Sequence, residues 1–434
     1  MGWKQEYEEK LRTPEEAVKI VRDGDVVYIG TASSVACVLA EALYKRKDEL
    51  ENVTISSSIN PWLLPFYTEP AGGTFSVRTY FAGQAEREAM KHSNCECTSL
   101  HLSQVDRWCR QTSGITVAFL DVSPPDKYGF MSDGAFGTAM HGFIKDKADR
   151  VVLQVNKNAP YVYGQQNLIH ISEADYVVEA EMNLGEVQDM PVDGVVKTIS
   201  EYIVDEIPDG ATIQLGLGGV SGAVGFGLEK KCDLGVHSEM MTNSMMHLMK
   251  KGIVTNKKKT FLPGKTVAAF SYGSRELYDF VDRNPEVMFA PYTYVNDPYI
   301  IGQNDKMMSV NTAMSIDLFG QVAADSMAGR QVSAVGGQVD FVRGAQLSRG
   351  GKSMIALPST MKKGDTVKSK IMAAFPPGTA VTTSRQDVHY VVTEYGCVNL
   401  KPLTIQERAR TLISLAHPDF RKELEEEAKK IGIL

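Results

Sequence analysis

The chain has 434 residues and a formal net charge of −7, with 43% hydrophobic and 23% charged residues. These values are ordinary for a soluble globular protein, and the length suggests two or three domains. The acidic balance argues against non-specific nucleic-acid binding, which needs a basic surface, and no stretch approaches the ~20 apolar residues of a membrane span.

The amino terminus and the cysteines indicate the compartment. Residues 1–6 are charged and lack the apolar run of a signal peptide. The six cysteines are scattered, and Cys95 and Cys97 form a close pair with no second Cys or His pair at zinc spacing. We therefore expect reduced thiols, a cytoplasmic protein, and no metal site.

Short runs rich in β-branched and apolar residues alternate with helical patterns along the chain. The expected helices are 14–21, 35–43, 195–206 and 405–415, and the expected strands are 26–29, 116–120, 151–155, 267–270, 353–357 and 391–392. Continuous apolar strands separated by helices are typical of parallel sheets covered on both faces. The pattern predicts an α/β fold.

The two halves of the chain resemble each other. Residues 23–43 and 209–228 both read Asp-Gly, a short strand, a glycine and then a helix, and the next strands, 53–58 and 234–239, keep the same spacing. We predict two tandem, related open α/β domains. Chance similarity of two β-turn-α units is the alternative, because such units recur across α/β folds.

The expected boundary lies near Pro191 and Gly194, where a helix opens. The N-terminal domain would then comprise residues 1–190. Residues 191–434 would form a C-terminal domain that carries the catalytic glutamate described next.

The second copy of the repeat has a carboxylate at a position where the first copy has none. It places Glu239 where the first copy has Ser58. A strand's carboxyl end is where open α/β sheets bind ligands. With a reference pKa of about 4.3, a glutamate there is expected to be ionised at pH 7 and able to act as a nucleophile without a general base. A capping or salt-bridged glutamate is the alternative. We do not expect a hydrolase built on His237 and Ser238, because adjacent residues of a strand point to opposite faces.

A glycine-rich turn precedes this strand. Gly216, Leu217, Gly218, Gly219 and Val220 lie between a strand and a helix. Glycines allow backbone N–H groups to approach a phosphate or an oxyanion at the positive end of the helix. The spacing does not match the dinucleotide fingerprint, and tight strand-to-helix packing is the alternative.

Two later segments also contain charged side chains that could bind a ligand or take part in catalysis. Residues 336–345 read GGQVDFVRGA, a turn in which Asp340 and Arg343 can pair with each other or with a ligand. The segment 390–396 ends a strand in a second carboxylate, Glu394. Glu394 is the alternative nucleophile if Glu239 is structural.

Together these motifs resemble the acetyl-CoA hydrolase/transferase family, within the class I CoA-transferases. The resemblance covers nearly the whole chain and rests on GLGG, GVHSEM, YVNDP, GGQVDFVRGA, VTTSR, YVVTEYG and AHPDF in the second half, and on SPPDKYGF and HIS in the first. The sequence departs from the family where Ser221 replaces a proline after the glycine turn, and again over residues 56–104, which would shape the acyl pocket.

The resemblance implies two NagB/RpiA-like α/β domains, with Glu239 as the catalytic glutamate. It also implies that coenzyme A, a substrate and not a bound cofactor, contacts the glycine turn and the residues Met314, Gly336, Gly337, Gln338 and Lys370.

The resemblance further implies a CoA-transferase. This enzyme would move CoA between a short-chain acyl-CoA, of the butyryl or 4-hydroxybutyryl type, and acetate through a glutamyl-CoA thioester. The expected partners are acyl-CoA, a short carboxylic acid and a second copy of the chain in a homodimer. The alternatives are hydrolysis of acyl-CoA at the same site and a non-catalytic protein that binds CoA or a sugar phosphate.

Overall fold

The structure is a computed structural model that describes residues 2–434. The chain forms two compact units: residues 1–188 with 267–295, and residues 189–266 with 296–434. The chain therefore passes between the units three times. The sequence led us to expect two continuous domains, and the membership of 267–295 in the first unit was not foreseen.

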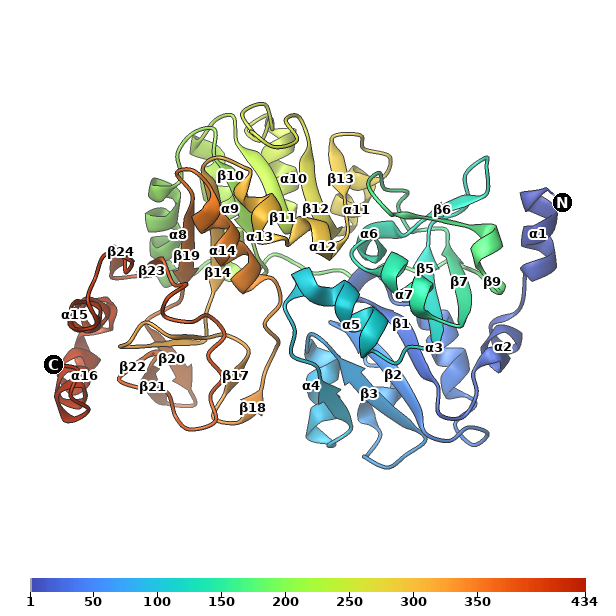
Figure 1. Ribbon diagram of the computed structural model, residues 1–434, viewed down its shortest axis with the longest axis horizontal. Helices are drawn as coiled ribbons and strands as arrows, with labels where there is room; N and C mark the ends of the chain where they lie inside the picture. Colours follow the sequence, from blue (N-terminus) through green and yellow to red (C-terminus); the bar gives the residue numbers. More distant parts are fainter. Residues whose placement is uncertain (1) are drawn as a thin grey trace. The chain divides into compact units, whose positions relative to one another are not determined.

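The first unit is built on a mainly parallel sheet in the order β4-β3-β2-β1-β5-β7-β9. Figure 1 shows these strands with the helices that follow them. The strands of this sheet are β1 (Val26–Thr31), β2 (Val53–Ser58), β3 (Phe75–Thr79), β4 (Cys95–Cys97), β5 (Val117–Val122), β7 (Arg150–Asn156) and β9 (Tyr176–Ala180). The helices are α1 (Trp3–Lys10), α2 (Pro14–Ala17), α3 (Cys37–Tyr44), α4 (Gln84–Lys91), α5 (Val105–Gln111), α6 (Gly134–Gly137) and α7 (His141–Lys147).

The remaining elements of the first unit are a small antiparallel pair and the inserted segment. β6 (Phe130–Ser132) pairs with β8 (Leu168–His170). The segment 267–295 contains most of β12 (Thr266–Ser271), α11 (Arg275–Val281), β13 (Val287–Phe289) and α12 (Tyr292–Val295).

The second unit has its own sheet, which runs β11-β10-β14-β19-β23-β24 within the unit. These strands are β10 (Thr212–Leu215), β11 (Gly235–Met241), β14 (Met307–Thr312), β19 (Lys352–Ala356), β23 (Tyr390–Thr393) and β24 (Gly396–Asn399). The helices are α8 (Gly194–Glu206), α9 (Gly219–Gly227), α10 (Asn243–Lys250), α13 (Pro298–Gly302), α14 (Gln338–Leu347), α15 (Ile405–Leu415) and α16 (Pro418–Lys430). All pairs are parallel apart from β23 with β24, which fits the buried apolar strands seen in the sequence.

Alternate residues of these strands point to two separate cores. Val236, Met354 and Ala356 pack with α8, α9 and α10 on one face. Ile355 and Val391 pack with α14 and α15 on the other face. Because successive side chains of a strand point to opposite faces, the alternation follows directly from the sequence of the strands.

The tandem repeat is reproduced in the order of the strands. In the first unit β1 lies between β2 and β5, and in the second unit β10 lies between β11 and β14. The mixed α/β class with two parallel-sheet domains is therefore confirmed.

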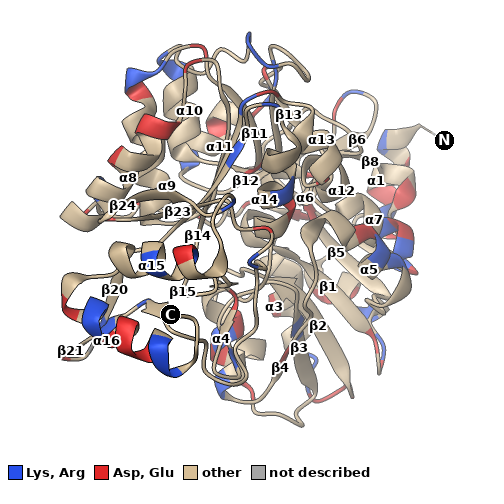
Figure 2. Cartoon of the chain, turned by 60° about the vertical axis from the view of Figure 1, so that its left-hand side comes forward, with Lys and Arg blue, Asp and Glu red and all other residues tan. Residues whose placement is uncertain are grey.

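Small two- and three-stranded sheets, antiparallel apart from the pairing of β15 with β22, extend the second unit beside its main sheet. They are β15 (Ser315–Asp317), β16 (Val322–Ala323), β17 (Ser326–Met327), β18 (Arg330–Gln331), β20 (Thr360–Lys363), β21 (Thr366–Ser369) and β22 (Ile371–Met372). The last helix, α16, has acidic and basic side chains interspersed along its surface (Figure 2).

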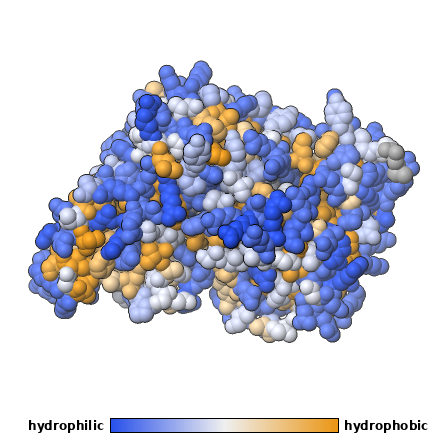
Figure 3. All heavy atoms as spheres, viewed as in Figure 1, coloured by the Kyte–Doolittle hydropathy of each residue, from blue (hydrophilic) through white to orange (hydrophobic). Residues whose placement is uncertain are grey.

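The surface gives no sign of a membrane-spanning segment. Within residues 2–434 every helix is too short or too polar to cross a bilayer. The face drawn in Figure 3 is largely hydrophilic, with apolar residues gathered over α15 and α16. The cytoplasmic location stays an expectation from the sequence.

Candidate active site

Glu239 lies near the carboxyl end of β11, at the edge of the sheet where ligands bind in open α/β folds. β11 runs parallel to β10, with Thr212 opposite Gly235 and Ile213 opposite Val236. Continuing this register places Gly216 opposite Glu239. The Ser238 hydroxyl donates to the Leu215 carbonyl over 3.3 Å, which keeps the two strands together at this point. The predicted nucleophile and the glycine turn are thus neighbours across one strand spacing, roughly 4.8 Å.

Two groups hold the Glu239 carboxylate. Asn296 Nδ2 donates to Glu239 Oε2 over 2.7 Å, and the Gly337 N–H also donates to the carboxylate. Asn296 is fully buried and is fixed beside Asp297, which caps the first turn of α13. A Cβ at position 337 would overlap both Glu239 Oε2 and Asn296 Nδ2. Gly337 is therefore required here because its backbone covers the carboxylate at close range.

The pKa of Glu239 is raised to about 7. The main cause is burial of the carboxyl, which removes water from the charged form. The nearby Asp340 charge raises the pKa further, and the hydrogen bonds from Asn296 and Gly337 lower it. The expectation of full ionisation at pH 7, taken from the reference pKa, is therefore wrong for the folded protein, because the sequence did not reveal how much water the surrounding residues remove from the carboxyl.

The glycine turn leads directly into α9. Gly218 is the N-cap residue with φ +117°, a conformation that favours glycine. A Cβ at Gly222 would meet nothing within 4 Å, and one at Gly219 would meet the Met190 Cβ at 3.9 Å. In contrast, a Cβ at Gly225 would overlap Ser244, which lies at the start of α10. Close packing thus explains Gly225, whereas the space beside Gly219 is open to a ligand.

The segment 336–345 differs from the turn with an internal ion pair that the sequence suggested. Gly336, with φ +61°, and Gly337 lead into α14. Arg343 forms an ion pair with Asp387 at 3.0 Å, from the turn after the VTTSR motif, while Asp340 is buried near Glu239. Residues three apart on one helix turn need not pair when other elements offer closer partners.

Gln338 links this segment to two others. Its Nε2 donates to the Thr312 carbonyl over 2.9 Å, and its Oε1 accepts from Thr383 Oγ1 at 2.9 Å. Both amide ends are therefore occupied by protein, which makes Gln338 a support for Gly337. Its predicted contact with CoA stays a prediction.

Met314 and Lys370 lie together in the small-sheet region that continues from β14. Lys370 Nζ donates to the carbonyl of Ala313, the residue before Met314, over 3.3 Å. Burial lowers the pKa of Lys370. A half-buried amino group of this kind suits an anionic ligand, and the role of both residues in CoA binding stays a prediction.

Glu394, the alternative nucleophile, has a structural environment. Both of its carboxylate oxygens accept hydrogen bonds from Ser359, from the backbone N–H at 2.9 Å and from the hydroxyl at 2.6 Å. This pair joins β23 to the loop before β20. The arrangement favours a role in fixing that loop.

His237 and Ser238 do not form a catalytic pair. The His237 Nδ1 lies 3.4 Å from Asn304 Nδ2, whereas the Ser238 hydroxyl donates to the Leu215 carbonyl. Both residues are fully buried.

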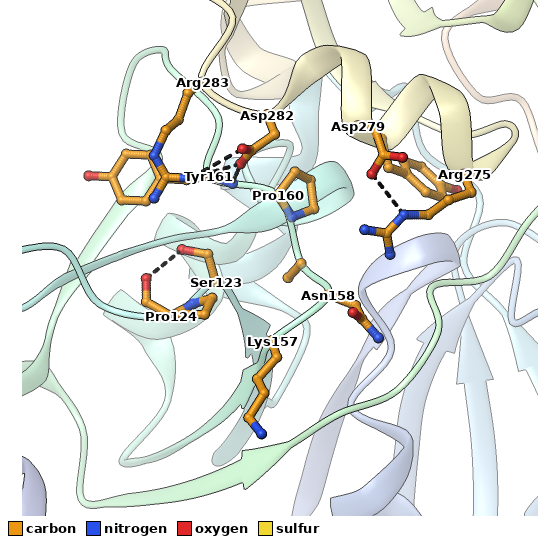
Figure 4. Close-up of a pocket in the computed structure, with 12 residues that line it drawn as sticks. Ser123, Pro124, Lys157, Asn158, Pro160, Tyr161, Arg275, Asp279, Asp282 and Arg283 are labelled. Carbon is orange, nitrogen blue, oxygen red and sulfur yellow. Dashed lines mark hydrogen bonds and ion pairs between the residues drawn. The ribbon is translucent and has the colours of Figure 1, made fainter.

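A cavity of about 330 Å³ opens in the first unit, and none of the predicted site residues lines it (Figure 4). Its cationic side chains already have acidic partners: Arg275 pairs with Asp279 at 2.8 Å, and Arg283 with Asp282 at 3.1 Å. Lys157 pairs with Glu181 at 3.0 Å. The cavity therefore has little unpaired charge with which to hold an anion.

The sequence analysis assigned no role to Asn296. This residue lies within YVNDP, a motif that carried the resemblance, so its position was visible although its function was not. Nothing in the sequence indicates that residues 296 and 239 meet, since 57 positions separate them.

Comparisons with known proteins identify the family of this chain. Residues 1–185 match the acetyl-CoA hydrolase/transferase N-terminal domain, and residues 273–428 match the C-terminal domain. The chain is 41% identical to 4-hydroxybutyrate coenzyme A transferase of Clostridium kluyveri over 99% of this chain and 100% of that protein. It is 37% identical to butyryl-CoA:acetate CoA-transferase of Anaerostipes caccae over 100% and 99%. The crystal structure of RipA from Yersinia pestis superposes with a TM-score of 0.93, at 35% identity and full coverage of both chains. The resemblance read from the motifs is thereby confirmed, and the chain belongs to the acetyl-CoA hydrolase/transferase family.

Proposed function

We propose that this protein is an acyl-CoA:carboxylate CoA-transferase that uses Glu239 as a covalent nucleophile. The observation that carries the proposal is the carboxylate at the end of β11, held by Asn296 and Gly337 beside a glycine turn with open space in front of it. The names of the two relatives support a short-chain acyl-CoA as donor and a short carboxylate as acceptor.

The first half-reaction loads CoA onto the enzyme. A Glu239 carboxylate oxygen attacks the thioester carbonyl carbon, and the CoA thiolate leaves to give an acyl-glutamyl anhydride. The thiolate then attacks the glutamyl carbonyl carbon. The first acid departs as a carboxylate, and a glutamyl-CoA thioester remains.

The second half-reaction runs these steps in reverse with another acid. Its carboxylate attacks the glutamyl thioester and releases the thiolate, which then attacks the new acyl carbonyl. Glu239 is restored and a new acyl-CoA leaves. One thioester is formed for each one broken, so no external energy source is needed.

The site offers the electrostatics that this sequence of steps requires. The N–H groups of Gly219 and Val220 lie in the first turn of α9, where they have no partner within the helix. They can donate to an oxyanion formed beside Glu239. Burial of Glu239 weakens its hydration, which raises the reactivity of its ionised form.

The covalent step is tested by mass spectrometry. Incubating the enzyme with acyl-CoA alone should add the mass of CoA to the peptide containing Glu239, and Glu239→Ala should show no adduct. Parallel initial-rate lines are expected from a ping-pong scheme. Intersecting lines without an adduct would refute it. Release of free CoA at the same rate with and without an acid would identify a hydrolase instead.

The acceptor is expected to be an aliphatic acid of roughly two to six carbons, because the acid must lie flat against the N-terminus of α9 to offset repulsion from Glu239. We would compare kcat/KM for acetate, propionate, butyrate, 4-hydroxybutyrate, octanoate and cinnamate with one donor. A tenfold preference for octanoate or cinnamate over butyrate, about 1.4 kcal/mol in transition-state binding, would show that the pocket accepts larger acids.

A further inference from the structure

Ser221 has a buried hydroxyl without a hydrogen-bond partner in the part of the chain that the structure describes. The residue lies in the first turn of α9, and it is 1% exposed. Among residues 2–434 its Oγ has no hydrogen-bond partner. Burying a polar atom without a hydrogen-bond partner costs free energy, so each such atom in a folded protein needs a functional or structural explanation.

The position of the hydroxyl suggests that reason. The Ser221 Oγ lies 3.9 Å from where a Cβ on Gly216 would stand. Gly216 is opposite Glu239 when the pairing of β10 with β11 is continued. The hydroxyl is therefore beside Gly216, the residue that follows β10 at its carboxyl end and lies next to the strand of the nucleophile.

The N-terminus of α9 lies at the same place and provides further hydrogen-bond donors, independently of Ser221. α9 begins with Gly218 as N-cap and has no side-chain cap, so the N–H groups of its first turn point out of the helix without a partner in it. A group that sat on this turn would meet these N–H donors and the Ser221 hydroxyl together. Such a set of donors suits an oxygen that gains negative charge.

We infer that the Ser221 hydroxyl donates a hydrogen bond to the oxyanion that forms when Glu239 attacks a thioester. This inference rests on the proposed function, and it adds a side-chain donor to the backbone donors of the turn.

The test compares Ser221→Ala with Ser353→Ala, a matched control. Ser353 lies in β19, is fully buried, and its hydroxyl also lacks a partner within residues 2–434. Removing one oxyanion donor typically costs about a hundredfold or more, and the backbone donors remain, so we expect kcat to fall about tenfold to a hundredfold for Ser221→Ala. The KM for acyl-CoA should stay within threefold, because the donor acts on charge that appears only in the transition state. Ser353→Ala should keep the wild-type kcat.

Rapid-quench mass spectrometry provides the decisive readout. The glutamyl-CoA adduct should form more slowly in Ser221→Ala by the same factor as kcat. Ser221→Cys keeps a similar volume but has a weak donor, and it should also be slow, so the test stands even if the alanine variant folds poorly. Adduct formation at the wild-type rate in both variants, an equal loss in Ser353→Ala, or a rise in KM with unchanged kcat would each overturn the inference. Absence of the adduct from the wild-type enzyme would instead refute the proposed function itself.

Discussion

Asn296 Nδ2 lies 2.7 Å from Glu239 Oε2 and donates to it, so an amide on one segment contacts the carboxylate on another. This hydrogen bond favours the charged form of Glu239, whereas burial and the charge of Asp340 oppose it, and the resulting pKa is about 7. The balance places the titration of the nucleophile within the physiological range.

The pH dependence of the reaction should show this balance. Only ionised Glu239 can attack, so kcat/KM for acyl-CoA should fall about tenfold per pH unit below pH 7. Asn296→Ala removes a bond that lowers the pKa and should move this limb to higher pH. Asp340→Asn removes a charge that raises the pKa and should move the limb to lower pH. A profile that shifts in the same direction in both variants, or in neither, would contradict this account of the site.

Loss of the Glu239 carboxylate should abolish transfer. We expect Glu239→Ala to lower kcat at least ~10³-fold, as removal of a covalent nucleophile does in other enzymes, with the melting temperature preserved or raised. Glu394→Gln serves as the comparison, because Ser359 engages both oxygens of that carboxylate. It should keep more than a tenth of the wild-type rate. If the two variants exchanged these outcomes, Glu394 would be the nucleophile.

A methyl group at position 337 should disable the site. In Gly337→Ala the new Cβ would overlap Glu239 Oε2 and Asn296 Nδ2, and the carboxylate would have to move. Misplacement by about 1 Å can cost a hundredfold in rate, so we expect at least that loss in kcat. Gly194→Ala is the control, since a Cβ there meets nothing within 4 Å. A Gly337→Ala enzyme with more than half the wild-type kcat would show that the close approach is unimportant.

The variant Gly219→Ala distinguishes two roles of the glycine turn, ligand binding and close packing of the strand against the helix. The protein has room for a Cβ at this position, with the Met190 Cβ 3.9 Å away. We therefore expect Gly219→Ala to keep or slightly raise the melting temperature, since alanine favours helices. The KM for acyl-CoA should nevertheless rise about tenfold, because a methyl group at the turn would block the approach of a ligand to its N–H groups. A lower melting temperature with unchanged KM would favour the packing role.

A buried carboxyl in the first unit should make stability depend on pH. Asp121 is 1% exposed, and burial raises its pKa to about 7, against about 3.9 in an unfolded chain. The folded state therefore binds its proton more tightly than the unfolded state. The stability that this tighter proton binding contributes is therefore fully present below the unfolded pKa of about 4, and it is lost as the pH rises from there through 7.

Asp121→Asn should remove this dependence. We expect the variant to be more stable than wild type by roughly 2 to 4 kcal/mol at pH 8, with no such advantage at pH 4. Urea unfolding at several pH values measures the difference, with the exposed Glu41→Gln as a control. An advantage that is equal at both pH values would mean that packing, and not titration, causes it. The Asp121 carboxyl accepts from Gln154 Nε2 at 2.5 Å, and Gln154 Oε1 accepts from the Val38 and Leu39 N–H groups at the start of α3. Gln154 therefore connects the substituted side chain to this helix.

Much of the fold could be predicted from the sequence because it depends on local patterns. The apolar run 151–155 became β7, and 405–415 became α15 with the expected bounds. The repeat of Asp-Gly, strand, glycine and helix gave the equivalent places of β1 and β10. The helix expected over 14–21 was less regular, since α2 ends at Ala17 and a 3₁₀ turn follows.

The position of Glu239 at a strand end, the neighbouring glycine turn and the family were determined by the sequence alone, because each depends on residues close together in the chain. Only the tertiary structure brought Asn296 and Gly337 to the carboxylate, moved residues 267–295 into the first unit, and gave Arg343 a distant partner in Asp387. These relationships join segments separated by tens of residues, and nothing in local periodicity encodes such distances. The raised pKa of Glu239 has the same origin, since burial is a property of everything packed around a group and not of the residues beside it in the chain.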